Sequence, residues 1–436
     1  MAYITRTTGS PMTNQKKFTY SAWLKITDLG TYQRPIQNYY DGNNRGYILF
    51  CSSSDSAANT FFIYDKEGGT INYQANTTAK FRDTNGWYHI VWRVDSTQAT
   101  QSDRVRFYVN GELQSMSIST NCNQNVNMGF NSAGSNLRIG GTESGSEPWK
   151  GVMSHVHFCD GYSYAPTEFG ETDSTTGEWK IKTSPSVTYG NNGFWVFKDD
   201  AAVTDRSGQG NNFTMSGSIT PTVDNPSNVF NTLNALFRHN VSSQNNVGFN
   251  HANTTWYPSS ATNNHSWGRS TLGWTSGKYY MEFKIEEAGG GQASGVWMVP
   301  SELPNNTSPQ STSNTAYGWQ VQFSGSDQNF YTTNGGSTVA TITTSVGSNP
   351  IIMMAIDADN NKMWVGHNGT WYNNNYASTT LNTSYPDHTW TPGTYGDMYQ
   401  LAFQAYYSSG AYNNAYGNFG NGYFGTTAVA SAGTNA

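Results

Sequence analysis

The chain has 436 residues, carries a net charge of −6, and contains 12% charged and 14% aromatic residues. This length exceeds what one ordinary hydrophobic core supports and predicts two or three domains. Without a clustered Lys/Arg stretch the chain is not expected to bind nucleic acid, and without an apolar run of ~18 residues it is not expected to insert into a membrane.

The N-terminal sequence and the cysteines indicate where the protein is made. The opening residues, MAYITRTTGSPM, lack the apolar core of a secretory signal. Cys51, Cys122 and Cys159 are an odd set without metal-type spacing, so we expect small buried residues and no disulfide framework. Synthesis and assembly in a cytoplasm are therefore expected.

Alternation of apolar and polar residues with a period of two predicts strands along the first half, and helical periodicity is almost absent. Asn110–Gly111 indicates a hairpin turn, because both residues tolerate positive φ. Pro166 is expected to open a single helical turn. Short strands separated by turns indicate a β-sandwich. The expected strands are residues 18–26, 87–94, 104–109, 137–140, 151–158 and 194–197.

A second series of alternating segments begins near Leu233, with a second hairpin turn expected at Asn368–Gly369. From Ser408 onward the Gly/Asn/Tyr-rich chain is expected to be a poorly packed, flexible tail. The expected strands are residues 277–285, 295–299, 318–323, 351–357, 362–365 and 400–406. The predicted division is a first domain at 1–214, a linker at 215–232 and a second domain at 233–436.

The first half resembles the concanavalin A-like jelly-roll family, which includes laminin-G-like and pentraxin-like domains. The resemblance implies an antiparallel jelly-roll sandwich. It rests on FTYSAWLKI at 18–26, GWYHIVWRVD at 86–95, RVRFYVNGEL at 104–113 and LRIGGTESGSEPWKGVMSHVHF at 137–158.

Three further segments resemble structural proteins of tailed bacteriophages that carry this domain. They are HFCDGYSYAPTEFGETDSTTGEWKIK at 157–182, NNGFWVF at 191–197 and DRSGQGNNFT at 205–214. Because these segments lie outside the generic sandwich, the resemblance implies a virion protein more than a generic lectin.

The second half resembles a SPRY domain, which implies a second antiparallel sandwich. The matching pieces are SGKYYMEFKI at 276–285, GVWMVP at 295–300, IIMMAIDADNNKMWVGHNGTW at 351–371 and NFGNGYF at 418–424. Phage relatives commonly continue past GYFGTTAVASAGTNA into a further strand, so either this edge ends differently or the C-terminus is missing. The expected fold class is all-β, with two tandem antiparallel β-sandwiches.

The sequence shows no convincing catalytic residues, and the protein is not expected to be an enzyme. Retaining glycoside hydrolysis needs two carboxyl groups ~5 Å apart. Glu282 and Glu286 share a predicted strand face, but Lys284 lies between them and a solvated face explains them as well. His155 and His157 also share a face, without a third metal ligand at a recognisable spacing.

No cofactor is expected to be required, and calcium is left as an open alternative. Many concanavalin A-like domains bind calcium through loop Asp, Asn and carbonyl oxygens. Ordinary turn chemistry explains such loops equally well. The two oxygen-rich loops are Asp41, Asn43 and Asn44, and Asp199, Asp200 and Asp205.

Loop aromatics are the candidate ligand-binding residues, because sugar sites typically stack rings on an apolar sugar face and fix hydroxyls with Asn, Asp or Gln. The alternative is that most of these rings pack in cores or between subunits, with Trp149 under the closing strands. The candidates are Tyr39, Tyr40, Trp149, Tyr162 and Tyr164 in the first half, and Trp256, Tyr257, Trp267, Trp371 and Tyr372 in the second.

We therefore expect a bacteriophage virion surface protein, either a capsid decoration or fibre or a tail-associated fibre, that adheres to host-surface glycans or proteins. The alternatives are an architectural virion protein that clamps neighbouring subunits, and a polysaccharide depolymerase. Since the sequence has no heptad or β-helix repeat, the chain is expected to dock on other capsid or tail proteins, or to form a homo-oligomer such as a trimer through its sandwich faces.

Overall fold

The structure is a computed structural model and it is all β in its described residues, apart from three short 3₁₀ helices. These helices are η1 (Gln101–Asp103), η2 (Gly129–Asn131) and η3 (Pro166–Glu168). The structure describes residues 2–9, 11–142, 144–199, 202–227, 229–237, 247–258, 265–286, 292–304, 317–324, 327–334, 337–342, 349–374, 376–392, 396–408, 411–412 and 414–429.

The chain divides into two compact units, Met1–Val229 and Phe230–Ala436. Each unit has its own buried hydrophobic core. The division falls inside the segment that the sequence analysis assigned to the linker. Residues 215 and 216 of that segment belong to a strand of the first unit, in which Met215 pairs with Ile4.

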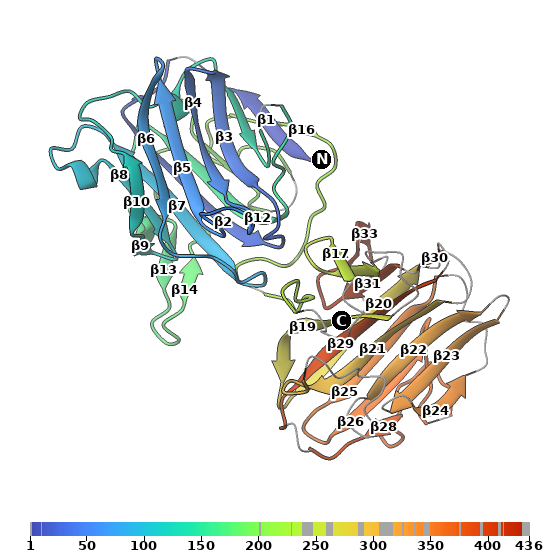
Figure 1. The fold of residues 1–436 in the computed structure, drawn as a ribbon. Helices are drawn as coiled ribbons and strands as arrows, with labels where there is room; N and C mark the ends of the chain where they lie inside the picture. Colours follow the sequence, from blue (N-terminus) through green and yellow to red (C-terminus); the bar gives the residue numbers. More distant parts are fainter. Residues whose placement is uncertain are drawn as a thin grey trace. The chain divides into compact units, whose positions relative to one another are not determined.

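The first unit is a sandwich of two antiparallel sheets, drawn in blue to green (Figure 1). The eight-stranded sheet has the order β10 (Met116–Thr120), β6 (Thr70–Thr77), β5 (Phe61–Glu67), β4 (Asn44–Phe50), β3 (Gln33–Asp41), β11 (Asn136–Ile139), β1 (Tyr3–Thr7) and β16 (Thr214–Ser216). The six-stranded sheet has the order β15 (Phe194–Val196), β12 (Gly151–Asp160), β2 (Lys17–Ile26), β7 (Trp87–Asp95), β8 (Val105–Val109) and β9 (Glu112–Leu113).

Both faces of the central strand β2 are buried. Phe18, Tyr20 and Leu24 lie in the core between the sheets, as the alternation predicts. The residues between them are covered by the chain that follows β12. In that segment, the carbonyl of Tyr162 accepts a hydrogen bond from Thr19 Oγ1, and the hairpin of β13 (Gly170–Thr172) and β14 (Trp179–Ile181) brings Trp179 onto this side.

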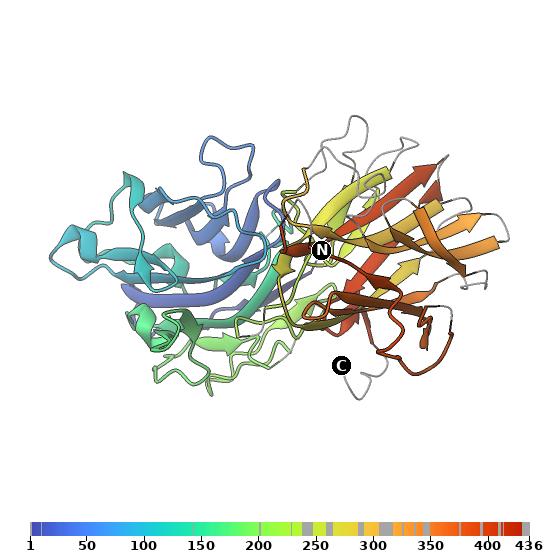
Figure 2. The same cartoon turned by 90° about the horizontal axis from the view of Figure 1, so that it is seen from below.

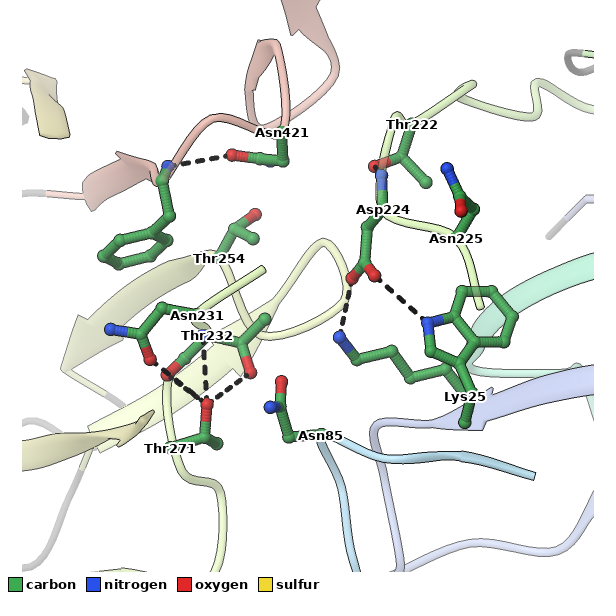
Figure 3. A network of polar contacts seen from close by, with 12 residues as sticks. Lys25, Asn85, Thr222, Asp224, Asn225, Asn231, Thr232, Thr254, Thr271 and Asn421 are labelled. Carbon is green, nitrogen blue, oxygen red and sulfur yellow. Dashed lines mark hydrogen bonds and ion pairs between the residues drawn. The ribbon is translucent and has the colours of Figure 1, made fainter. Parts of the chain in front are cut away.

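The segment after β16 is also fixed to the first unit (Figure 3). Asp224 accepts a hydrogen bond from the buried Lys25 on β2 and another from Trp87 Nε1 on β7. A sequence-distant carboxylate therefore completes the outer side of the six-stranded sheet.

The second unit is again a sandwich of two antiparallel sheets (Figure 1; Figure 2 gives the view from below). One sheet has the order β17 (Val247–Asn250), β18 (Thr255–Pro258), β31 (Asn414–Asn418), β20 (Lys278–Glu286), β25 (Ile351–Asp357), β26 (Lys362–His367) and β27 (Thr370–Trp371), with β28 (His388–Thr389) on β26. The other has the order β19 (His265–Trp274), β29 (Tyr399–Ser408), β21 (Gln292–Pro300), β22 (Tyr317–Ser324), β23 (Asp327–Asn334) and β24 (Ser337–Ile342), with β30 (Ala411–Tyr412) on β29. A separate hairpin pairs β32 (Tyr423–Phe424) with β33 (Thr427–Ala428).

The all-β, two-sandwich prediction is confirmed, together with all twelve expected strands. Both predicted hairpin turns have positive φ at Asn and Gly, as at Asn110 (φ 51) and Gly111 (φ 82). The poorly packed tail predicted from Ser408 onward is wrong for the described residues 414–429. Strand β31 pairs with both β18 and β20, and its Ala415 is fully buried, so these residues complete a sheet.

Candidate functional site on the eight-stranded sheet

The eight-stranded sheet of the first unit turns one face to the core and the other outward. On β4, Ile48 and Phe50 are fully buried in the core, whereas Tyr47 and Leu49 are half-buried and lie on the opposite face. The outward face is therefore the part of this sheet that is able to meet a ligand.

Seven residues on the side of the sheet away from the core form a line, which we call the transverse row, and two of them, Gln37 and Tyr64, are buried. Directly paired residues of antiparallel strands share a face, and each member of the row pairs with the next one. The row runs through Thr5, Arg138, Gln37, Tyr47, Tyr64, Gln74 and Thr120. Its members are hydroxyl, amide, guanidinium and phenol side chains, which all form hydrogen bonds.

Three aromatic rings form the centre of this face. Tyr47 and Tyr64 are stacked, with ring centroids 5.1 Å apart and an interplanar angle of 21°. Phe62, two residues before Tyr64 on β5, lies 6.1 Å from the Tyr47 ring. Burial raises the pKa of the Tyr47 hydroxyl, which therefore stays protonated and able to donate a hydrogen bond at neutral pH.

Arginines flank the stacked rings. The Arg34 guanidinium lies 3.8 Å from the centre of the Tyr47 ring, and the Arg45 guanidinium lies 5.6 Å from that of Tyr64. Both distances are within the range of cation–π attraction. Burial lowers the pKa of Arg34. The Glu147 carboxylate, 2.5 Å from the Arg34 guanidinium, raises this pKa and offsets part of the shift.

Neighbouring groups on the same face hold two of its arginines in place. Arg34 Nη1 donates to Gln37 Oε1 at 3.0 Å, and Arg138 Nη1 donates to the carbonyl of Thr142 at 2.7 Å. The Nε–H groups of Arg34, Arg45 and Arg138 are buried and have no acceptor among the described residues. Such a surface suits a ligand that is rich in oxygen acceptors and carries negative charge.

The predicted aromatic residues of the first half are distributed over three places. Tyr39 pairs with Arg45 and lies half-buried beside the transverse row, and Tyr40 is 58% exposed. Trp149 is half-buried and packs against the core. Tyr162 and Tyr164 stack on each other at 5.9 Å, over the outer side of the six-stranded sheet. The structure therefore does not gather these five residues into one site.

In the second half, three of the predicted aromatics are core residues, so their assignment as ligand residues needs correction. Trp256 has no exposed surface and donates to the carbonyl of Gln404 at 2.9 Å. Trp267 packs 4.9 Å from Trp297, and Tyr372 is 5% exposed. The two others, Tyr257 and Trp371, are half-buried.

The carboxylates of the two predicted calcium loops are engaged in other contacts. Asp41 Oδ1 accepts from the backbone N–H groups of Asn43 and Asn44 and from the Asn44 amide, which is turn chemistry. Asp205 accepts four hydrogen bonds, including one from the N–H of Trp195 at 2.9 Å. Asp199 pairs with Arg206 at 3.2 Å.

Asp200 lies outside the described residues. In the described part of the chain, no group of three or more His, Cys, Asp or Glu side chains is arranged to hold a metal ion. Calcium binding stays a prediction.

The histidine pair on β12 also uses its ring nitrogens within the fold. His155 Nδ1 lies 2.8 Å from Ser154 Oγ, and His157 Nδ1 lies 2.9 Å from the hydroxyl of Tyr189. Burial lowers the pKa of both rings, to about 4 for His155. Both rings are therefore neutral parts of a packed cluster.

One serine–histidine contact looks like a nucleophile and its base but has the wrong proton arrangement. Ser21 Oγ lies 2.8 Å from His89 Nε2, and the Trp179 indole donates to His89 Nδ1 at 3.0 Å. Since an indole N–H only donates, Nδ1 carries no proton and Nε2–H donates to Ser21. His89 in this tautomer cannot take the serine proton, and both residues have no exposed surface.

Glu282 and Glu286, the candidate acid pair on β20, each bind a different tyrosine. Glu282 accepts from the Tyr280 hydroxyl at 2.6 Å, and Glu286 accepts from that of Tyr416.

None of the helices in the described part of the chain has the length and hydrophobicity to cross a bilayer.

The comparisons agree with this architecture. Residues 2–166 match the family model described as the concanavalin A-like lectin/glucanases superfamily, which assigns that fold to the first unit's sandwich. No curated protein matches the chain.

Three of the solved structures to which parts of the chain are similar are the following. A proposed carbohydrate binding protein from Bacteroides ovatus is 17% identical, with 50% of this chain and 58% of that chain covered and a TM-score of 0.33. The LG4-5 domains of the mouse laminin alpha1 chain are 7% identical over 96% of this chain and 84% of that one, with a TM-score of 0.30. The SPRY domain of human HERC1 is 15% identical over 38% and 87%, with a TM-score of 0.25.

Proposed function

We propose that the protein binds acidic glycans through the outward face of its eight-stranded sheet and performs no catalysis. The observation that carries the proposal is the stacked Tyr47–Tyr64 pair with Arg34 and Arg45 against it, at the centre of the transverse row. The lectin-like fold of residues 2–166 is consistent with it.

The chemistry of the face favours a charged saccharide over a neutral one. Guanidinium groups bind carboxylates and sulfates through paired N–H donors, and a cation already packed on a ring loses little freedom on binding. Gln74 supplies a half-buried amide group that both donates and accepts, which suits sugar hydroxyls. The strands hold all of these side chains at fixed spacing, so binding costs little reorganisation.

We further propose that this binding serves attachment of a bacteriophage particle to its host. The resemblance of residues 157–182, 191–197 and 205–214 to phage structural proteins supports this role. In this proposal the chain sits on the virion surface, docked on capsid or tail proteins or as a homo-oligomer, and meets glycans of the host surface.

The experiment is binding of the full chain to an array that pairs each neutral glycan with its carboxylated or sulfated form. We expect retention on the acidic members and a loss of at least tenfold with Tyr47→Ala or Arg45→Gln. Tyr40→Ala is the matched control, because Tyr40 is an exposed tyrosine of the same sheet that is not in the transverse row. If Tyr40→Ala removes binding while Tyr47→Ala does not, the loop-aromatic site is right and the sheet face is wrong. Absence of all glycan binding favours the architectural alternative.

A further inference from the structure

The chain between β27 and β28 in the second unit forms a small lobe, residues 373–374 and 376–387. Trp371 and Ser378 exchange both backbone hydrogen bonds, at 2.7 and 2.9 Å. The Asp387 carboxylate accepts the N–H groups of Val365 and Asn374, each at 2.8 Å. Trp364 on β26 donates its indole N–H to the carbonyl of Asn382 at 3.0 Å. The lobe is therefore tied to the sheet at both ends and in the middle.

Asn373 holds the interior of the lobe in shape. Its side chain is 1% exposed and makes three hydrogen bonds: Nδ2 donates to the carbonyls of Tyr376 and Thr380 at 3.2 and 3.1 Å, and Oδ1 accepts the N–H of Asn382 at 2.7 Å. Asn373 and Asn374 both have left-handed backbones, with φ of 47° and 53°, which Asn tolerates better than most residues. A loop fixed in this way presents a preformed surface.

A cavity of ≈ 420 Å³ opens in this lobe, which is within the usual size range of small-ligand sites. Its described lining consists of amide, hydroxyl, aromatic and aliphatic side chains, among them Ser378, Thr380 and Asn382, and includes no Asp, Glu, His, Lys or Arg.

Two exposed tyrosines accompany the cavity. Tyr376, a lining residue, is 66% exposed, and Tyr385 is 45% exposed. Their ring centroids lie 5.2 Å apart and the rings are tilted by 46°. Large rings this open to water, beside a polar concavity, are suited to stacking against a ligand with an apolar face.

We propose that this lobe is a second binding site, which takes a neutral saccharide of one or two rings. The C–H face of a sugar packs on the Tyr376 ring, while its hydroxyls exchange hydrogen bonds with groups that both donate and accept. The uncharged lining gives no attraction for the acidic glycans proposed for the first unit. The site stands independently of that proposal. Two sites in one chain raise the avidity for a surface that carries both acidic and neutral saccharides.

The test is titration of the full chain with neutral mono- and disaccharides of glucose, galactose, mannose and N-acetylglucosamine, followed by saturation-transfer NMR and calorimetry. We expect Tyr376→Ala to weaken binding about tenfold, and Tyr376→Phe to keep it, since stacking survives. The control is Tyr279→Ala, a 40% exposed tyrosine on β20 of the same unit, which is expected to bind like the unaltered protein.

Specificity and location are checked in the same titrations. An acidic oligosaccharide is expected not to displace the neutral sugar, and Tyr47→Ala in the first unit is expected to leave the neutral-sugar affinity unchanged. The proposal is overturned if none of these sugars binds, if Tyr376→Ala binds as well as the unaltered protein with an unchanged unfolding midpoint, or if an acidic oligosaccharide or a peptide library competes for the lobe instead.

Discussion

Lys25 Nζ lies 2.6 Å from Asp224 Oδ2, and the lysine has no exposed surface (Figure 3). Burial lowers the pKa of Lys25, and the adjacent Asp224 charge counteracts that shift. The other carboxylate oxygen of Asp224 accepts the Trp87 indole N–H at 3.1 Å. One aspartate, 199 positions away in the sequence, therefore compensates a buried cation and fixes the end of the first unit.

Removing that aspartate is expected to destabilise the first unit strongly. Asp224→Ala leaves the buried ammonium without its hydrogen-bonded counter-charge, and breaking such a pair typically costs ~3–5 kcal/mol. The measurement is the urea midpoint of the first unit's unfolding transition, read separately from that of the second unit.

The double variant Lys25→Met/Asp224→Ala is the matched control. With no charge left to compensate, it is expected to recover most of the loss. Equal destabilisation by the double and single variants contradicts the charge-compensation account.

His89 makes the stability of the first unit sensitive to acid. Its ring is stacked on Trp23 at 4.8 Å, and burial lowers its pKa from 6.5 to about 3. Between these two pH values the unfolded chain binds the proton and the folded chain does not, so stability falls as pH decreases from 6.5 toward 3. At pH 4 this single group is expected to lower the free energy of unfolding by ~3 kcal/mol.

His89→Phe is expected to lower stability at pH 7, because Ser21 and Trp179 lose their hydrogen-bond partner. The same variant is also expected to reduce the decrease in the free energy of unfolding between pH 6.5 and pH 4. Burial raises the pKa of Asp65 to about 6, so this group increases the stability as the pH falls. Since Asp65 is present in both the unaltered protein and His89→Phe, the difference between their pH profiles isolates the contribution of His89. Parallel profiles contradict this assignment.

Gly129 occupies a place where no side chain fits. A Cβ there is 1.9 Å from the carbonyl oxygen of Lys66, and the Gly129 N–H binds the buried Asp65 at 3.0 Å. Gly129→Ala is expected to cost at least ~1–3 kcal/mol by overpacking. Gly42→Ala is the control, because nothing lies within 4 Å of its added Cβ. Equal thermal midpoints for the two variants contradict the prediction.

Glycan binding to the first unit is expected to depend on salt. Since the face presents guanidinium groups to a charged ligand, raising ionic strength from about 0.05 M to about 0.5 M is expected to weaken the affinity severalfold. Neutral-sugar binding to the lobe at Tyr376 is expected not to change. A salt-independent affinity for the acidic glycan indicates that the arginines do not contact its charge.

Regular alternation made several strands predictable from sequence. Lys17–Ile26 and Ile351–Asp357 have clear apolar periods, and both are strands within one residue of the expected bounds. The four successive strands β3 to β6 were not foreseen. Gln33, Gln37 and Asn38 of β3 are polar and nevertheless buried, which removes the contrast between faces that reveals a strand.

The candidate site was missed for a related reason. The sequence analysis selected aromatic residues in predicted loops as candidate ligand-binding residues, whereas Tyr47 and Tyr64 lie within strands. The alternation of Arg45 with Tyr47 and of Phe62 with Tyr64 was a readable signal of one face on each strand. Placing them side by side requires the register between strands, which depends on long-range packing that alternation does not specify.

The most direct test of the central claim is the NMR spectrum of the arginine Nε–H groups in the full chain, recorded while an acidic oligosaccharide is added. The account predicts shifts for Arg34, Arg45 and Arg138, which lie on the proposed face, and none for Arg93 on the six-stranded sheet. Shifts confined to Arg93 or Arg206, with the three face arginines unchanged at saturation, contradict it.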